Sequence, residues 1–176
     1  MANSTDERVV TGLFNDRDSA ENAYNSVAAR GYGKDDINLV MSDETRKTHF
    51  GAAGNTKTEL GTKAAEGAGV GGAIGGTLGA IAAAVAAVGT SIAIPGLGLV
   101  IAGPLAAAIA GAGAGGAAGG LVGALIGWGI PEERIKRYES GIKSGGILMG
   151  VKARSNDDAK YFQDEWKRSN GTEIYA

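Results

Sequence analysis

The pattern of apolar and polar positions divides the chain into two amphipathic flanks and a long uncharged middle. Residues 8–14 (RVVTGLF) are rich in β-branched and aromatic side chains, which predicts a strand. A helix is predicted next, with Asp18 and Glu21 spaced as a capping box and Gly31 placed to end it. Residues 37–41 (INLVM) alternate and predict a second strand. The first flank is therefore a β-α-β unit.

The second flank repeats this alternation with one more helix. Pro131 stands at a plausible first helical position, and residues 146–153 (GILMGVKA) alternate as a strand would. Ser155 and Asp158 predict the N-terminal cap of another helix, and residues 173–175 predict a short closing strand. The apolar stripes of the two helices are Ile135, Tyr138 and Ile142, and Ala159, Phe162 and Trp166. The second flank is therefore α-β-α-β.

Together the flanks predict an α+β domain, a ferredoxin-like split βαβ sandwich interrupted by a long Gly/Ala-rich α-helical hairpin. Residues 1–41 form its first half, 42–62 a polar linker, 63–130 the hairpin and 131–176 the second half. In this arrangement the second and third strands of the domain are antiparallel neighbours. The hairpin is then expected to project as a stalk.

The hairpin is predicted from residues 67–131, which carry no charge and are mostly Gly, Ala and aliphatic side chains. Glycine costs roughly 1 kcal/mol against alanine inside an exposed helix, so a regular ladder of glycines indicates close packing of helix backbones. The helix-packing and oligomerisation positions are Gly67, Gly71, Gly75, Gly79, Gly111, Gly115, Gly119, Gly123 and Gly127. An aliphatic ridge on the first helix contains Val70, Ile74, Leu78, Ile81, Val85 and Val88. The hairpin tip is expected at Pro95, Gly96, Gly98 and Pro104.

Two functions from different classes fit a glycine-zipper hairpin. One is a membrane-associated homo-oligomer, because each arm is long enough to span roughly 30 Å of hydrocarbon. Cations on both sides of the hairpin, Lys57, Lys63, Arg134, Lys136 and Arg137, agree with two cytoplasmic ends at the inner face of the cell membrane. The other is a soluble homo-oligomer, a filament, ring or shell packed through the hairpins. A ligand-sensing ferredoxin-like module is a third possibility.

Composition limits the chemistry that the chain is expected to carry. The net charge is −2, which does not favour a nucleic-acid partner, and the absence of cysteine excludes thiolate catalysis and disulfides. His49 is the one histidine, so no metal site is proposed. Gly111, Gly113 and Gly116 match GxGxxG, but they lie in an alanine-rich run without a preceding strand. We therefore expect no enzyme activity, no cofactor, no small-molecule substrate and, without a basic–apolar leader, a cytoplasmic location.

Two segments resemble a known family. VVTGLFNDRDSAENAYNSVAARGYGKDDINLV (residues 9–40) is similar to the N-terminal domain of the bacterial heat-induced general stress proteins. IPGLGLVIAGPLAAAIAGAGAGGAAGGLVGALIGWGIPEERIKRYESGIKSGGILMGVKA (residues 94–153) resembles the related low-temperature-induced members. The resemblance implies a stress-associated protein, and it carries over neither an active site nor a settled biochemical activity.

Overall fold

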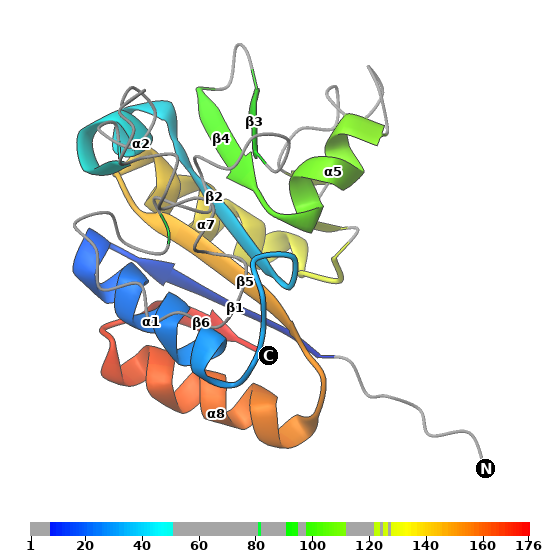
Figure 1. Cartoon of the computed structure of the whole chain (residues 1–176). Helices are drawn as coiled ribbons and strands as arrows, with labels where there is room; N and C mark the ends of the chain where they lie inside the picture. Colours follow the sequence, from blue (N-terminus) through cyan, green and yellow to red (C-terminus); the bar gives the residue numbers. More distant parts are fainter. Residues whose placement is uncertain are drawn as a thin grey trace, which may run out of the picture.

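The two flanks form one antiparallel sheet that also takes in part of the uncharged middle. The sheet has six strands in the order β3-β4-β2-β5-β1-β6, and its paired strands are antiparallel (Figure 1). The protein is therefore of the α+β class. The computed structural model describes residues 8–50, 81, 91–94, 98–111, 122–123, 125–126 and 128–176.

Each flank contributes one β-α-β unit, and the strands of the two units interleave. The elements are β1 (Arg8–Phe14), α1 (Arg17–Ala29), β2 (Ile37–Ser42), β5 (Ile147–Ala153), α8 (Asn156–Arg168) and β6 (Thr172–Tyr175). β5 lies between β1 and β2, with Val10 opposite Val151 and Leu39 opposite Met149. β1 in turn lies between β5 and β6. The expected antiparallel pairing of the second and third strands of the domain, β2 and β5, is confirmed.

Local hydrogen bonds explain where the helices begin and end. The predicted cap at Ser155 is confirmed, because its side chain accepts from the amide of Asp158 at 3.1 Å. The predicted cap at Asp18 is wrong: Asp16 precedes the helix in an extended conformation and accepts from the amide of Ser19 at 2.8 Å. Hydrogen bonds from Ser19 also hold the pKa of Asp16 below its usual value. Gly31 follows α1 with a φ of +79°, as a terminating glycine should.

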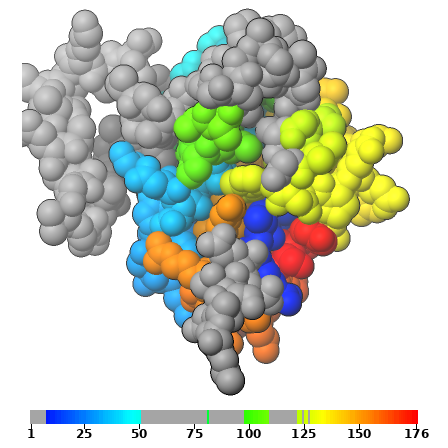
Figure 2. Space-filling model, turned by 90° about the vertical axis from the view of Figure 1, so that its right-hand side faces the viewer, coloured from blue at the N-terminus to red at the C-terminus, as the bar shows by residue number. Residues whose placement is uncertain are grey.

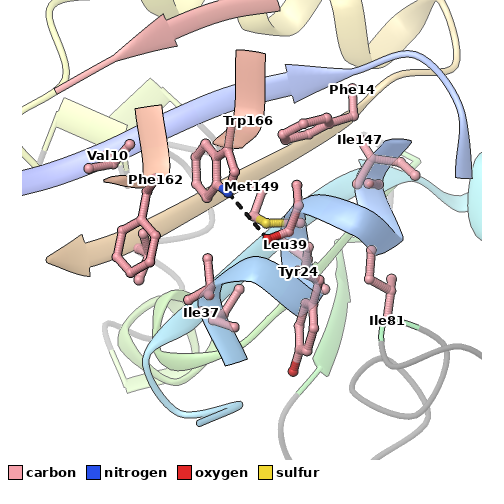
Figure 3. Close-up of a cluster of buried hydrophobic side chains, with 14 of the residues drawn as sticks. Val10, Phe14, Tyr24, Ile37, Leu39, Ile81, Ile147, Met149, Phe162 and Trp166 are labelled. Carbon is pink, nitrogen blue, oxygen red and sulfur yellow. Dashed lines mark hydrogen bonds between the residues drawn. The ribbon is translucent and has the colours of Figure 1, made fainter. Parts of the chain in front are cut away.

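Helices cover both faces of the sheet and create two apolar cores. α1 and α8 pack on one face, over what we call the first core (Figure 3), which includes Val10, Phe14, Leu39, Met149, Phe162 and Trp166. The Trp166 indole donates to the carbonyl of Ala23 at 3.3 Å, and its ring packs edge-on against Phe14. α7 (Glu132–Lys143) and α5 (Pro104–Gly111) border the second core, which includes Leu13, Val40, Ile101, Leu105, Tyr138 and Leu148. The predicted apolar stripes of α7 and α8 are buried as expected.

The segment expected to be a linker begins instead with a helix, α2 (Asp43–Phe50). Ser42 accepts from the amide of Thr45 at 3.0 Å, and Asp43 pairs with Lys47 one turn later at 2.6 Å. This helix is polar almost throughout and is attached through buried Phe50, so it has no apolar stripe that the sequence could reveal.

The segment expected to be an irregular hairpin tip is also different. Residues Ser91–Ile94 form β3 and Leu99–Ala102 form β4, and β4 pairs with β2 from Leu39↔Ala102 to Ser42↔Leu99. These residues therefore extend the sheet of the domain and do not lie at the end of a projecting stalk. The free edge of β2 and the β-branched residues of 91–102 explain the pairing. Among the described residues, no helix has the length and apolar character needed to cross a bilayer.

Candidate functional site

The structure places only some of the residues that the sequence singled out. Gly98 forms the turn before β4 with a φ of +61°, Pro104 opens α5, Gly111 ends α5, and Gly123 is helical together with Val122. The other predicted packing and tip positions lie outside the described residues: Gly67, Gly71, Gly75, Gly79, Gly115, Gly119, Gly127, Pro95 and Gly96. The candidate site is therefore built from the points where the uncharged segment meets the α+β domain.

The first such point is the junction of β4 and α5, which sits on β2. We call β3, β4 and α5 together the clasp. Asn38 of β2 is 3% exposed, and its side-chain oxygen accepts from the amide of Leu105 at 2.6 Å, so the sheet caps the first turn of α5. Gly103 has a φ of +96°, and a Cβ there would overlap the carbonyl oxygen of Ile37. The clasp is thus held by one buried cap and one close backbone contact.

Sequence reasoning missed Asn38, although a signal was present. Asn38 is the one polar residue within the apolar alternation INLVM. A buried amide side chain in such a strand needs a hydrogen-bond partner, and that partner proves to come from the uncharged segment.

The second point is the end of the uncharged segment, at the described residues 122–123, 125–126 and 128–130. Leu125 and Ile130 are buried in the second core, and the amide of Ile130 donates to the carbonyl of Leu125 at 3.1 Å. Trp128 packs against it and covers Gly150 of β5, where a Cβ would overlap the indole ring. The Trp128–Gly150 contact fixes the end of the segment on the sheet.

A third point involves Ile81, which belongs to the predicted aliphatic ridge. Ile81 is fully buried in the first core (Figure 3), and its amide donates to the Glu21 carboxylate of α1 at 3.2 Å. The ridge residue Ile81 therefore contacts the α+β domain. Burial, with the nearby charge of Glu21, raises the pKa of Tyr24 to about 12.

The described parts of the uncharged segment have two unlike faces. Bulky Leu105 and Leu125 are buried against the sheet, whereas Ala107, Ala108 and Gly123 are exposed. Ile126, one turn beyond Gly123, is 50% exposed, and a Cβ on Gly123 would meet no atom within 4 Å. Figure 2 shows green atoms of residues 98–111 and yellow-green atoms of the described residues between 122 and 130 on the same face of the molecule. This outward face of small residues with one exposed Ile is the candidate interaction surface.

A polar cluster lies between the end of α1 and the start of α8. The Tyr32 hydroxyl donates to Asp158 at 2.8 Å and accepts from the amide of Arg154 at 2.7 Å. Asp158 also accepts from Arg30 at 2.9 Å, and Arg154 pairs with Asp36 at 2.8 Å. Burial raises the pKa of Tyr32. Since these groups satisfy one another, the cluster ties two helices together.

Two of the cations expected to face a membrane are bound within the domain. Arg137 lies 3.2 Å from Glu173 and Arg134 lies 3.9 Å from the same carboxylate, with its guanidinium over the ring of Tyr175. Tyr138, beside them, donates to the carbonyl of Glu173 at 2.9 Å. Lys136 alone of the three cations is exposed without a contact to Glu173 among those described. Contacts with Glu173 of β6 therefore account for two of the three cations that follow the hairpin.

The described part of the chain contains no candidate metal site. No group of three or more His, Asp or Glu side chains there has the geometry to hold a metal ion. His49 lies at the end of α2, where its ring contacts Phe50 and its carbonyl accepts from Arg17 at 3.0 Å. The hydrogen bond from Arg17 joins α2 to the start of α1, and the ring contact lies within α2.

Comparison with known proteins adds no family to this description. The chain matches no protein-family model, no curated protein and no solved structure.

Proposed function

We propose that this protein is a non-enzymatic, stress-associated module that self-associates through its uncharged glycine-zipper segment, residues 67–131. The α+β domain anchors the segment. One observation carries the proposal: Leu105 and Leu125 are buried on the domain, while Ala107, Ala108 and Gly123 face outward. These bulky side chains of the segment thus pack on the domain, and its small exposed residues are accessible to another copy.

The ferredoxin-like part of the proposal is supported by the topology of the flanks. The sub-sheet β2-β5-β1-β6 interleaves two β-α-β units, and α1 and α8 contact each other on the face of the first core. This is the order that a split βαβ sandwich requires. The clasp then adds two strands at the β2 edge.

Small outward residues favour self-association for a physical reason. Without side chains between them, two helix backbones approach closely and gain many dispersion contacts. Ile126 lies one turn from Gly123, so an Ile126 side chain of one copy fits beside the open Gly123 surface of another. Complete burial of an isoleucine contributes about 1.5–3 kcal/mol, and Ile126 is half exposed, so each such contact contributes roughly half of that.

Attachment to the inner face of a membrane is the second candidate function. The absence of charge over residues 67–131 and the exposed Ile126 favour contact with lipid. The clasp argues against a simple spanning hairpin, because β4 is paired with β2 of the domain. Arg134 and Arg137 also contact Glu173, which reduces their availability to lipid headgroups. Self-association is therefore the better supported of the two functions.

The substitution Gly123→Ile tests the proposal. Its added side chain meets open space in a single copy, so the fold is expected to remain intact. Between copies the same side chain forces the backbones apart, and overpacking costs about 1–3 kcal/mol per site. We expect the concentration for half-maximal association, measured by analytical ultracentrifugation, to rise by one order of magnitude or more. The control is Ser140→Ile, which places an isoleucine side chain at an exposed position of α7 outside the candidate surface.

Gly123→Ile also distinguishes self-association from membrane attachment. Lipid binding increases with apolar area, so Gly123→Ile should strengthen flotation with anionic vesicles if the surface contacts a bilayer. If the surface joins copies of the chain, the same substitution should weaken self-association. An unchanged particle size for Gly123→Ile, at concentrations where the natural chain associates, would rule out the small-residue face as the contact between copies.

A further inference from the structure

We propose that the Asn170–Gly171 peptide is a covalent modification site that the fold keeps unreactive while β6 is paired with β1. The modification is deamidation of Asn170, in which the side chain closes a ring with the next residue and the ring is then hydrolysed. It proceeds when β6 separates from β1, and the isoaspartate product then prevents β6 from pairing again. The site lies in the α+β domain and does not depend on self-association of the uncharged segment.

The sequence places the two reacting groups next to each other. Asn170 alone among the asparagines of the chain is followed by glycine. In the reaction, the deprotonated backbone nitrogen of Gly171 attacks Cγ of Asn170, a five-membered imide closes, and ammonia leaves. One water molecule then opens either carbonyl of the imide, which gives aspartate or isoaspartate, so the net change replaces the side-chain amino group with a hydroxyl. Glycine has no Cβ to hinder the attack, and its backbone adopts the required conformations readily.

The end of α8 holds the Gly171 nitrogen in an unreactive state. Asn170 has a φ of +57°, its amide donates to Lys167 at 3.2 Å, and the amide of Gly171 donates to the carbonyl of Trp166 at 2.8 Å. This is a Schellman helix terminus. A Cβ on Gly171 would lie 2.8 Å from the Phe14 ring, so the peptide is also closely packed. Because the nitrogen must lose its proton and turn toward Cγ, the hydrogen bond and the packing both oppose the reaction, although Asn170 itself is exposed.

β6 fixes the other side of the site, and its own attachment is slight. It is an edge strand of four residues that pairs with β1 at Thr11↔Tyr175 and Leu13↔Thr172, with a register shift between the two (Figure 1). Glu173 has a φ of +50°, a conformation that disfavours residues other than glycine. Local opening of such a strand requires less free energy than global unfolding. Opening of β6 therefore releases the adjoining peptide while the rest of the sheet stays paired.

The isoaspartate product does not fit the closed arrangement. Its main chain runs through the former side chain, which adds one methylene group before Gly171 and displaces that residue by about 1.5 Å, one carbon–carbon bond. In the closed state both neighbours are fixed, because Gly171 donates to the Trp166 carbonyl and the Thr172 hydroxyl donates to the Leu13 carbonyl at 3.2 Å. The longer chain cannot satisfy both hydrogen bonds in the same register. The modified protein therefore stays open at β6.

Peptide mapping by mass spectrometry tests the site on the full-length chain. The protein is incubated in mildly alkaline buffer with and without guanidinium chloride, and conversion at Asn170 is followed over time. We expect conversion in the denaturant, and conversion slower by about tenfold or more without it, because only the open fraction reacts. Equal rates in the two conditions, or no conversion in the denaturant, would overturn the proposal.

The substitution Ile174→Ala tests whether opening of β6 controls the reaction. Ile174 packs against the first core and lies beside Gly171, so its truncation loosens β6 and leaves the reacting pair unchanged. Without denaturant, we expect conversion at Asn170 to rise severalfold, while Asn25, an exposed residue of α1 that precedes Ser26, keeps its rate. An unchanged rate at Asn170, or an equal rise at Asn25 that indicates global unfolding, would show that β6 does not control the reaction.

Two substitutions at Asn170 serve as controls for the effect of the product. Asn170→Gly retains a residue suited to a positive φ and removes the reacting amide, so the same incubation should leave its β6 amides protected from hydrogen exchange. Asn170→Asp carries the charge of the product without the added methylene, and its β6 amides should be protected as well. The isoaspartate form, separated by chromatography after refolding, should exchange faster at residues 172–175 and keep the protection of β5. Protection of β6 in that form equal to that of Asn170→Asp would overturn the predicted loss of pairing.

Discussion

Replacing Gly103 by alanine should open the clasp while the rest of the domain stays folded. Gly103 lies between β4 and α5 with a φ of +96°, and its backbone touches β2. Gly98 is a matched control in the same clasp, because it also has a positive φ, +61°, and a Cβ there would meet nothing within 4 Å. The two substitutions therefore share the conformational strain and differ in the contact with β2.

The difference in unfolding free energy follows from these contacts. Alanine in the left-handed region costs about 1–2 kcal/mol, which should be the whole effect of Gly98→Ala. At Gly103 the new methyl overlaps the carbonyl oxygen of Ile37, which is fixed in the sheet and cannot rotate away. Relief requires α5 to move from β2, and the hydrogen bond from Leu105 to Asn38 is then lost. An unsatisfied buried acceptor adds about 1–3 kcal/mol, so Gly103→Ala should cost about 2–5 kcal/mol in total.

Hydrogen exchange locates the damage, and urea unfolding followed by circular dichroism measures it. In Gly103→Ala we expect faster exchange of the amides of β4 and of Leu105, with β1 and β5 amides protected as in the natural chain. In Gly98→Ala the amide of Leu105 should keep its protection. Equal stability losses in the two variants, or a uniform loss of protection across β1 and β5, would refute the view that close contact of Gly103 with β2 holds the clasp in place.

Three further predictions concern the α+β domain. Gly141→Ala in α7 should destabilise by about 1–3 kcal/mol in chemical denaturation despite better helix propensity, because the methyl overlaps the Leu13 side chain; in a Leu13→Ala background the same change should stabilise. Tyr24 has a pKa of about 12 in the folded state against an ordinary value of 10.0, so the unfolded chain ionises first as the pH rises. The folded state is therefore most stable below pH 10 and loses stability as the pH rises toward 12. Unfolding titrations should show that Tyr24→Phe loses about 3 kcal/mol less stability at alkaline pH than the natural chain does. Ser155→Ala should lower the melting temperature through the loss of the cap to Asp158, at about 1 kcal/mol.

The flanks could be predicted because local and long-range signals agree there. Residues 8–14 and 147–153 are strands within one residue of the expected bounds, and the helix stripes ending at Ile142 and Trp166 are buried as expected. Gly31 predicted the end of α1 because glycine readily adopts the positive φ found there. The pairing of β2 with β5 followed from the order of these elements alone.

The middle of the chain was harder because its signals do not distinguish a helix from a strand. A short apolar run gives no period, so the sequence predicts a helical hairpin tip at Pro95, Gly96, Gly98 and Pro104, although proline and glycine are also typical of β-hairpin turns. The helix Asp43–Phe50 is almost entirely polar and depends on one buried ring. The polar Asn38 within INLVM indicates that a hydrogen-bond partner is needed, but the partner, Leu105, is distant along the chain and cannot be identified from a local pattern. Most of the predicted glycine positions lie outside the described residues, and their packing role stays a prediction.

The symmetry of the proposed contact between copies limits what it can build. The outward face with Gly123 and Ile126 can meet the same face of a second copy, which pairs two chains and then stops. The clasp lies on β2 of its own chain and covers that strand edge, so the edge adds no second contact between copies. Gly123→Ile should therefore convert pairs into single chains, and Gly103→Ala should leave the pairs intact because it changes a contact within one chain. Sedimentation of the two variants at equal concentration distinguishes these products, and particles of the natural chain larger than pairs would show that a second surface takes part.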